Sequence, residues 1–286
     1  MRIALFGGLY NNYLALEAAI RDAHSRGAEQ LFCLGDLGAF GPYPDRVFPL
    51  LHEADVQCLQ GNYDDSVGND LEDCQCGYTD PRDNEFAQIS YDYTLQNTSL
   101  ENREWLRTLP KEIRFSIGDV QILLCHGSPR KVNEFLWEST TSTQFLEKLT
   151  RDYNADVIFG THTGIHWQRK LGEGKRFVNV GVLGRPANDG RTNVWYTLVD
   201  FKDERDSGKP SANGDHPSRN QLCERSRDSL NHLHVEFVPL EYDHLRLARE
   251  MREEKLPEAF IETVLTGWWT TCLEVLPSRE RRAGVH

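Results

Sequence analysis

Residues 2–36 read RIALFGGLYNNYLALEAAIRDAHSRGAEQLFCLGD, and the order of patterns in them predicts the type of sheet. RIALF (2–6) and QLFCLGD (30–36) are short apolar runs that end in turns, as buried strands do. Between them, LALEAAIRDAHSRG (14–27) carries apolar residues at helical spacing and ends at a glycine. A strand, a helix and a second strand in this order predict a parallel sheet whose functional loops follow the strand carboxyl ends.

The same alternation continues along the chain. Further strand-and-turn units are predicted at VQCLQGNYDD (56–65), EIRFSIGDVQILLCHGSPR (112–130, a hairpin), DVIFGTHTG (156–164), KRFVNVGVLGRP (175–186), NVWYTLVDF (193–201) and HLHVEFVPL (232–240). Helices are predicted at DRVFPLLHEA (45–54), LENREWLRTLP (100–110), TSTQFLEKLTRDYNA (141–155) and DHLRLAREMREEKLPEAFIETVLTGWW (243–269, broken at Pro257).

Two segments show no clean periodicity. Residues 66–98 are polar, so we expect a long excursion over the surface, of a length that is often functional. Residues 202–231 are rich in Ser, Gly, Pro, Asn and charge, which predicts a flexible insert. We therefore expect one domain over residues 1–240 and a C-terminal helical extension over residues 241–286 that packs on it.

Composition narrows the class of protein. The formal net charge of −12 argues against general nucleic-acid or anionic-membrane binding, which needs a basic face, but permits a small phosphate ester held by local cations. No apolar run approaches about 18 residues and the start MRIALFGG has no signal-peptide core, so we expect no membrane segment and a cytoplasmic protein. The seven scattered cysteines are expected to be free thiols, with Cys33, Cys58 and Cys125 in strand cores.

Four polar residues stand at the ends of four different apolar runs. They are Asp36 after LFCLG, Asn62 after VQCLQG, His126 after VQILLC and His162 after DVIFGT. Side chains at one edge of a sheet converge, and a carboxylate, a carboxamide and two imidazoles form a nitrogen and oxygen shell for a transition metal. Each residue alone is an ordinary loop residue, so it is the ordered set that predicts a metal site.

These residues lie in four motifs, which are Gly35-Asp36, Gly61-Asn62-Tyr63-Asp64, Cys125-His126-Gly127-Ser128-Pro129 and Thr161-His162-Thr163-Gly164. Their order resembles that of the calcineurin-like metallophosphoesterases, and within them the small bacterial and archaeal phosphodiesterases. The resemblance runs from residue 2 to about residue 200 and resumes over VEFVPLEYDHLRLAREMREEKLPEAFIETVL (235–265). It implies an α/β fold, a four-layer αββα sandwich of the metallo-dependent phosphatase type with a C-terminal helical hairpin.

The resemblance implies two metals at one edge of both sheets, and one of the two pockets has lost its ligands. Its ligands in the family are an Asp and a His after the first strand and the second histidine of the last motif. These positions are Gly8, Tyr10 and Gly164 in this chain. The first metal site is therefore degenerate, and we expect no second metal.

The other pocket is intact. It keeps Asn62, His126 and His162, and the aspartate that bridges both metals in the family is Asp36. We expect one divalent transition metal on these four residues, and Zn, Mn and Fe are all compatible with them. Such a metal polarises a phosphoryl oxygen and lowers the pKa of bound water.

Other groups are candidates to refill the empty pocket, and each has a plainer alternative. Tyr10 either binds a metal as a tyrosinate or packs its ring over the gap. His166 either turns inward from the loop GIHWQRK or stays a surface histidine beside Trp167. Cys74 and Cys76 either supply a thiolate or a redox pair, or are two unpaired loop cysteines.

A phosphate substrate requires cations. Arg130 follows HGSP, Arg185 follows NVGVLG, and Arg191 lies further along the same loop. A guanidinium binds phosphate oxygens in bidentate fashion, and the alternative for each arginine is simple surface exposure. Asn12 matches the asparagine after the first motif of the family and is a further substrate-binding candidate.

The corner that follows Gly61 and Asn62 is where the resemblance implies a general-acid histidine. Tyr63 stands there and is a candidate proton donor to a leaving alkoxide. Asp64 is expected to orient a ligand histidine. Trp268 and Trp269 either close over an aromatic substrate or anchor the C-terminal hairpin.

We therefore expect an enzyme, a metal-dependent phosphoesterase that hydrolyses a phosphate mono- or diester at a reduced, mononuclear site, with Arg185 meeting the phosphate. Two alternatives stay open: a ligand-binding or scaffold protein that has lost hydrolysis, and non-phosphoester chemistry at a redox-active iron. The expected partner is a small phosphorylated substrate, and the sequence carries no signal for an oligomeric state.

Overall fold

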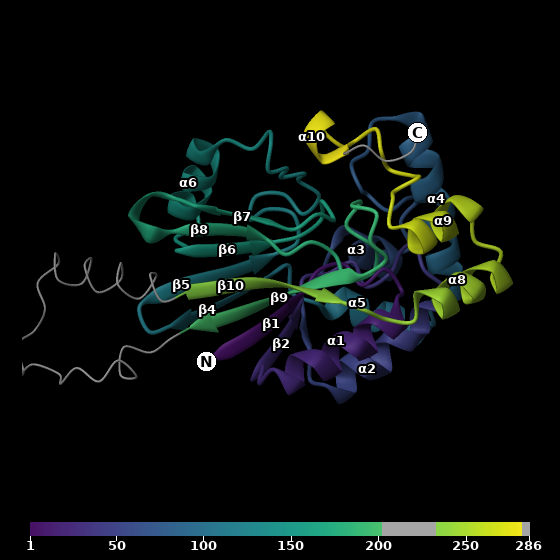
Figure 1. Cartoon of the computed structure of the whole chain (residues 1–286), viewed down its shortest axis with the longest axis horizontal. Coiled ribbons are helices and arrows are strands. Elements are labelled where there is room, and N and C mark those ends of the chain that lie inside the picture. Colours follow the sequence, from purple (N-terminus) through teal and green to yellow (C-terminus); the bar gives the residue numbers. More distant parts are fainter. Residues whose placement is uncertain (202–232, 282–286) are drawn as a thin grey trace, which may run out of the picture.

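A computed structural model describes residues 1–201 and 233–281 of the chain. It folds them into two five-stranded sheets with helices on both outer sides (Figure 1). The strand orders are β10-β9-β1-β2-β3 in the first sheet and β4-β5-β6-β8-β7 in the second.

The first sheet has the parallel centre that the sequence predicted. This centre consists of β1 (Arg2–Phe6), β2 (Gln30–Cys33) and β3 (Gln57–Cys58). β9 (Val194–Phe201) pairs antiparallel with β1, and β10 (Leu233–Leu240) pairs antiparallel with β9. The sheet is thus mixed, because β9 runs in the opposite direction to β1, whereas β10, which is antiparallel to β9, runs in the same direction as β1.

The second sheet is also mixed. β4 (Glu112–Ile117) and β5 (Val120–Cys125) form the predicted hairpin. β5 runs parallel to β6 (Val157–Gly160), and β6 runs parallel to β8 (Arg176–Asn179). The edge strand β7 (Trp167–Lys170), which the sequence pattern did not predict, pairs antiparallel with β8.

The two sheets face each other across an apolar core. Ile3 and Leu5 of the first sheet and Ile122, Leu124 and Phe159 of the second are all buried in it. Successive residues of a strand point to opposite faces, so the intervening side chains cover the outer faces and receive the helices.

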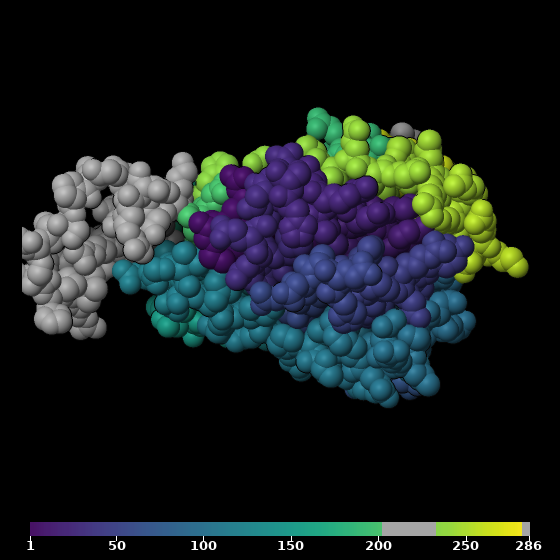
Figure 2. Space-filling model, turned by 90° about the horizontal axis from the view of Figure 1, so that it is seen from below, coloured from purple at the N-terminus to yellow at the C-terminus, as the bar shows by residue number. Residues whose placement is uncertain are grey.

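Helices on both outer faces complete the four-layer αββα sandwich. The outer face of the second sheet packs on Leu146 and Leu149 of α6 (Thr143–Asp152). The other longer helices are α1 (Tyr13–Ser25), α2 (Val47–Glu53), α3 (Asn62–Asn69), α4 (Pro81–Asn97), α5 (Leu100–Thr108), α8 (His244–Glu253) and α9 (Glu258–Thr266). Three short elements are the 3-10 helices η1 (Pro44–Arg46) and η2 (Gly172–Gly174) and the single-turn α-helix α10 (Ser278–Arg281). Figure 2 shows α1 and α2, in purple and blue, bordered by the yellow-green C-terminal helices.

Most of the expected excursion over residues 66–98 is helical, which corrects that prediction. α4 begins directly after its N-cap residue Asp80, whose side chain accepts hydrogen bonds from the backbone of the first helical turn. Its buried face includes the polar residues Asp83, Ser90 and Thr94, so a hydrophobic period is absent from the sequence even though the helix is half buried.

The predicted C-terminal helical hairpin is confirmed as α8 and α9, with Pro257 as the cap between them. The flexible insert expected at residues 202–231 lies outside the described residues. Within the described part of the chain, no helix has both the length and the apolar character that are needed to cross a bilayer.

Candidate metal centre

Three buried side chains from three strand ends meet at one edge of the two sheets. Asp36 follows β2, His126 follows β5 and His162 follows β6. Nε2 of His126 lies 3.2 Å from Oδ2 of Asp36 and 3.2 Å from Nδ1 of His162. Ligand atoms bound at about 2.1 Å to one ion are themselves about 3.0–3.4 Å apart, so these separations suit a shared metal.

His126 is oriented by the backbone of the neighbouring sheet. Its Nδ1 lies 2.6 Å from the carbonyl oxygen of Leu34. A carbonyl can only accept, so Nδ1–H donates this bond and Nε2 faces Asp36 and His162 with its lone pair. A backbone partner of this kind is typical of histidines that bind metals.

Two polar atoms at this edge have no hydrogen-bond partner. They are Nε2 of His162 and Oδ1 of Asn62, and both are buried. Buried polar atoms are normally paired, so each unpaired atom requires an explanation. A cation bound by Asp36, His126 and Nδ1 of His162, with Asn62 beside it, would pair with Oδ1 of Asn62, and in this respect the donors fit a metal.

The charges at this edge also suit a cation. Burial alone disfavours a charged His126, but Asp36 outweighs that effect and raises the pKa of the imidazole. Burial likewise opposes a charged Asp36, but His126 holds the pKa of the carboxyl below its usual value. Burial, and then the nearby His126, lower the pKa of His162 to about 3, so its ring is neutral and keeps a lone pair for a metal.

Asp64 holds the loop that carries Asp36. Its carboxylate accepts hydrogen bonds from the backbone N–H groups of Asp36 at 2.7 Å, Gly61 at 2.8 Å and Leu37 at 2.9 Å. The prediction that Asp64 orients a ligand histidine is therefore wrong, because its oxygens bind the backbone of two loops instead. Burial and the charge of Asp36 raise the pKa of Asp64 to about 6.

Two glycines allow these loops to approach each other. Gly35 has a φ of +83°, and a Cβ there would run into the backbone of Gly61. A Cβ at Gly61 would in turn collide with the carboxylate of Asp36 and lie 3.0 Å from Cε1 of His126. A side chain at either glycine would separate Asp36 from His126.

A disulfide lies against Asn62. Cys74 and Cys76 are bonded to each other, which corrects the expectation of free thiols at these positions. Nδ2 of Asn62 donates to the carbonyl oxygen of Cys74 at 2.8 Å and to Sγ of Cys76 at 3.4 Å, which leaves Oδ1 as the unpaired atom. The thiols predicted in strand cores are free and buried, as expected for Cys33, Cys58 and Cys125.

Aromatic rings fill the places of the lost ligands. A Cβ at Gly8 would lie 2.6 Å from Cε1 of Tyr10, so the Tyr10 ring packs in the space that Gly8 leaves. A Cβ at Gly164 would lie 2.9 Å from Cη2 of Trp269. The Tyr10 ring is thus placed as in the packing alternative, and burial, with the charge of Asp36, raises the pKa of its phenol.

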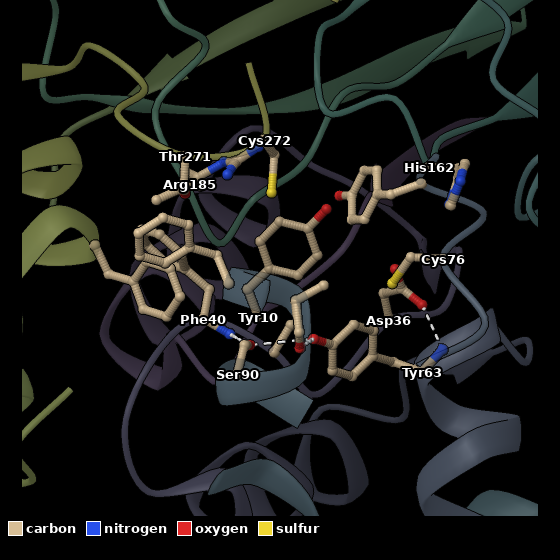
Figure 3. Close-up of a pocket in the computed structure, with 15 residues that line it drawn as sticks. Tyr10, Asp36, Phe40, Tyr63, Cys76, Ser90, His162, Arg185, Thr271 and Cys272 are labelled. Carbon is tan, nitrogen blue, oxygen red and sulfur yellow. Dashed lines mark hydrogen bonds between the residues drawn. The ribbon is translucent and has the colours of Figure 1, made fainter. Parts of the chain in front are cut away.

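A cavity extends from Asp36 and His162 along this aromatic side (Figure 3). In the figure Tyr10 stands at its centre, with Asp36 and His162 on one side and Arg185 and Cys272 above. The remaining lining residues are Ala39, Phe40, Tyr63, Cys76, Tyr78, Phe86, Ala87, Ser90, Phe260 and Thr271. The cavity therefore joins the metal ligands to a largely aromatic wall.

Arg185 is the one predicted arginine that lines this cavity. Its guanidinium carbon lies 3.5 Å from the centre of the Trp269 ring and 5.5 Å from that of Phe40. The residue is only 6% exposed and its Nε has no hydrogen-bond partner. Among the described residues, no carboxylate forms an ion pair with this buried cation.

The structure places the other two predicted arginines elsewhere. Arg130 forms an ion pair with Glu134, four residues along the chain, and lies 4.8 Å over the ring of Phe145. Arg191 is exposed and lines a separate cavity with Tyr242. Neither lines the cavity beside Asp36, because the loop positions that follow the motifs turn away from it.

His166 does not join the metal ligands. Its ring packs against the rings of Trp195, at 4.4 Å, and Phe237, at 4.6 Å, on the strands β9 and β10. It lines no part of the cavity beside Asp36. Its predicted surface position beside Trp167 is also wrong, since aromatic rings of the first sheet cover it.

Asn12 and Tyr63 are buried and use their polar groups within the fold. Asn12 caps α1 by accepting from the backbone of Ala15 at 3.0 Å, and it donates to the carbonyl of Gly184 at 3.2 Å. The Tyr63 hydroxyl donates to Oγ of Ser90 at 3.1 Å, and burial raises its pKa. Asn12 thus positions the loop before Arg185, and the Tyr63 hydroxyl points away from the metal ligands (Figure 3).

Sequence reasoning missed several lining residues. Phe40, Tyr78 and Cys272 reach the cavity from three distant segments and carry no motif. For Phe40 a signal existed, because it follows Asp36 by four residues in the same loop. Trp269 was expected either to cover a substrate or to anchor the hairpin, and its bonds to Pro186 and Asn188 favour the anchor.

Comparison with known proteins assigns the family. The protein-family model for the calcineurin-like phosphoesterase superfamily domain matches residues 1–204 of this chain. The chain therefore belongs to that superfamily. The chain is 24% identical over 281 residues to the uncharacterized protein MJ0912 from Methanocaldococcus jannaschii, with 93% of this chain and 98% of the relative covered.

Solved structures share the fold. The hypothetical protein PH1004 from Pyrococcus horikoshii OT3 superposes with a TM-score of 0.70 at 21% identity, covering 94% of this chain and 99% of that one. A metallophosphoesterase from Sphaerobacter thermophilus superposes with a TM-score of 0.63 at 22% identity, covering 93% and 99%. These matches confirm the fold that the motifs predicted.

Proposed function

We propose that this protein hydrolyses phosphate mono- or diesters with one divalent transition metal, Zn, Mn or Fe. The observation that carries the proposal is the convergence of Asp36, His126 and His162 beside the buried Oδ1 of Asn62, which has no hydrogen-bond partner among the described residues. Membership of the calcineurin-like phosphoesterase superfamily supports metal-dependent phosphoester chemistry. One carboxylate and two imidazoles suit these metals, and Oδ1 of Asn62 is the further donor we assign to the shell.

A single metal is proposed because the second pocket is filled. The rings of Tyr10 and Trp269 lie where side chains at Gly8 and Gly164 would have to project. The metal would supply a Lewis acid that polarises the phosphoryl oxygens. With one cation near the phosphate instead of two, esters with good leaving groups are expected to react fastest.

The chain's own residues have separate tasks in this proposal. Asp64 keeps Asp36 in place through the backbone, and the Leu34 carbonyl orients His126. Arg185 is the residue we propose to contact the phosphate, since it is buried, it lines the same cavity, and its Nε has no hydrogen-bond partner in the described part of the chain. The Tyr63 hydroxyl is excluded from the proposal because it is bonded to Ser90.

The first test is elemental analysis of protein purified without added metal or chelator, followed by assays with p-nitrophenyl phosphate and bis(p-nitrophenyl) phosphate. We expect about one equivalent of Zn, Mn or Fe and hydrolysis of at least one ester. His162→Ala should lose both, whereas His24→Ala, an exposed histidine near the end of α1, should keep both. Unchanged hydrolysis by His162→Ala would contradict the mechanism, and about two equivalents of metal would contradict the single site.

The filled second pocket also supports another candidate, a ligand-binding or scaffold protein on the same fold. Bound metal and bound phosphate with no turnover of either ester would favour it. We do not propose the iron redox alternative, because Cys74 and Cys76 form a disulfide and the Tyr10 ring packs against Gly8.

A further inference from the structure

We propose that the vacated metal pocket is an oxyanion subsite in which the guanidinium of Arg185, positioned by Trp269, supplies the positive charge of the missing ion. The identity of the anion as a phosphoryl group rests on the proposed function. The subsite itself rests on the packing of the vacated pocket, on the unpaired state of Arg185 and on the bonds that hold Trp269.

The Trp269 ring occupies the space over Gly164, where its Cη2 lies 2.9 Å from the position that a Cβ of residue 164 would take. The guanidinium carbon of Arg185 lies 3.5 Å from the centre of the same ring. One indole therefore both removes the room for a ligand at position 164 and fixes a cation beside the cavity.

Trp269 is itself held in place by the loop that carries Arg185. Its indole N–H donates to the carbonyl of Pro186 at 2.7 Å, and its backbone N–H donates to Oδ1 of Asn188 at 2.9 Å. Nδ2 of Asn188 continues the network to the carbonyl of Arg281 at 3.1 Å. The C-terminal segment and the arginine loop thus fix each other, which makes Trp269 a positioning residue.

The same loop is tied to the first turn of the chain. The backbone N–H groups of Leu183 and Gly184 both donate to the carbonyl of Gly8, at 3.0 and 2.8 Å. Asn12 holds the carbonyl of Gly184 from the other side at 3.2 Å. Arg185 is therefore held at the vacated pocket from two directions and needs little rearrangement to receive a ligand.

The positive charge of Arg185 and the aromatic residues around it indicate the chemical class of the ligand. A guanidinium that is 6% exposed, with an unpaired Nε and aromatic rings as its neighbours, lacks the counter-charge that a buried cation requires. The cavity connects it with Asp36 and His162, so an anion bound there can reach both Arg185 and the metal ligands. A tetrahedral oxyanion such as a phosphoryl group offers oxygens in both directions and matches the guanidinium fork.

The test measures binding of inorganic phosphate by calorimetry to the full chain, with the metal content of each sample determined. Arg185→Gln should weaken phosphate binding by about 10- to 100-fold, as expected when hydrogen bonds to a charged group are lost. Arg169→Gln is the matched control, because Arg169 also lies over a tryptophan, Trp167 at 5.3 Å, but far from this cavity. The affinity of the Arg169→Gln variant for phosphate should equal that of the unaltered protein.

The positioning role of Trp269 has its own variants. Trp269→Leu should weaken phosphate binding and raise KM with little change in metal content, and Trp269→Phe should restore most of the affinity because a ring still stacks on Arg185. If Trp269→Leu does not fold, Trp269→Phe and Arg185→Lys decide the point. The lysine variant keeps the charge but loses the planar stack, and it should bind phosphate more weakly than the unaltered protein.

The outcomes separate this inference from the proposed function. Phosphate binding that depends on Arg185 in a protein without hydrolysis would support the subsite and contradict the proposed enzyme. Hydrolysis together with phosphate binding that Arg185→Gln leaves unchanged would overturn the subsite and leave the enzyme standing.

Discussion

The two sides of the cavity differ in the kind of polar atom that they leave unpaired. The metal side comprises Asp36, Asn62, His126 and His162, and the vacated side comprises Gly8, Tyr10, Gly164, Arg185 and Trp269. The metal side buries an imidazole nitrogen and an amide oxygen without partners, and the vacated side buries a guanidinium nitrogen without one. Atoms with lone pairs invite a cation, whereas an N–H donor with a positive charge invites an anion.

The vacated side is packed with aromatic rings and is not an empty space. Loss of ligands alone would leave a hole, and holes in a protein interior are destabilising. Instead the Tyr10 ring lies against Gly8 and the Trp269 ring lies against Gly164. Where the resemblance implies ligands of a second ion, this chain has packed aromatic rings and one arginine.

The largest expected effect comes from changing one residue on each side. His126→Ala removes the imidazole that lies 3.2 Å from both Asp36 and His162, so metal content should fall from about one equivalent to near zero and hydrolysis should be abolished. Tyr10→Phe should leave metal content unchanged, since the ring packs and the phenol does not ligate. Elemental analysis of both variants measures their metal content. Loss of metal from Tyr10→Phe would show that the phenol of Tyr10 is a metal ligand.

A smaller effect is expected from the residue that positions Asp36. Asp64→Asn weakens the hydrogen bonds to three backbone N–H groups, and metal affinity should fall by about 10- to 100-fold, as is typical for partners of metal ligands. Asp65→Asn, at the half-exposed neighbour, is the control and should bind metal normally. Competition with a chromogenic chelator measures both affinities, and equal values would show that Asp64 does not support the metal side.

The packing of the vacated side is tested by adding one methyl group. Gly164→Ala meets both a φ of +79° and the Trp269 ring, whereas Gly27→Ala has the same φ and nothing within 4 Å. Gly27→Ala should cost about 1 kcal/mol of stability from backbone strain, and Gly164→Ala about 1–3 kcal/mol more from overpacking. Urea unfolding compares the two, and equal losses would mean that Trp269 does not fill the pocket.

The smallest effect concerns the disulfide beside Asn62. Replacing Cys74 and Cys76 together by serine removes Sγ as a partner of the Asn62 amide, while the carbonyl of residue 74 remains. Metal affinity should fall by less than about tenfold, the lower limit for an outer partner of a ligand. Reduction of the unaltered protein with a dithiol should have the same effect, and a gain in affinity would instead indicate a thiolate ligand.

The sequence predicted the strands and most helices because their apolar period is local. β1, β2, the β4–β5 hairpin, β6, β8 and β9 all lie within the predicted runs. α4 was missed because its buried face carries polar residues such as Asp83 and Ser90. These two side chains accept hydrogen bonds from the backbone of Val275 and Phe40, which are distant in the sequence. β7 was missed because it has only four residues and, at the edge of its sheet, they show a weak alternation of buried and exposed side chains.

The residues that stand at the strand ends of the site could be predicted from the sequence alone. The approach of Asp36, His126 and His162 follows from that order, since parallel strands end at one edge. The resemblance to the family pattern implies that ligands are missing at Gly8 and Gly164, and the sequence alone is enough to find these positions.

The side chains that fill the positions of the missing ligands could not be predicted from the sequence. Trp269 stands 105 residues beyond Gly164, and no periodicity links the two positions. Its contact with Arg185, the pairing of Arg130 with Glu134 and the burial of His166 all depend on how separate loops turn after their strands. Strand positions come from short-range patterning, whereas the direction of a side chain in a loop is set by long-range packing and hydrogen bonds.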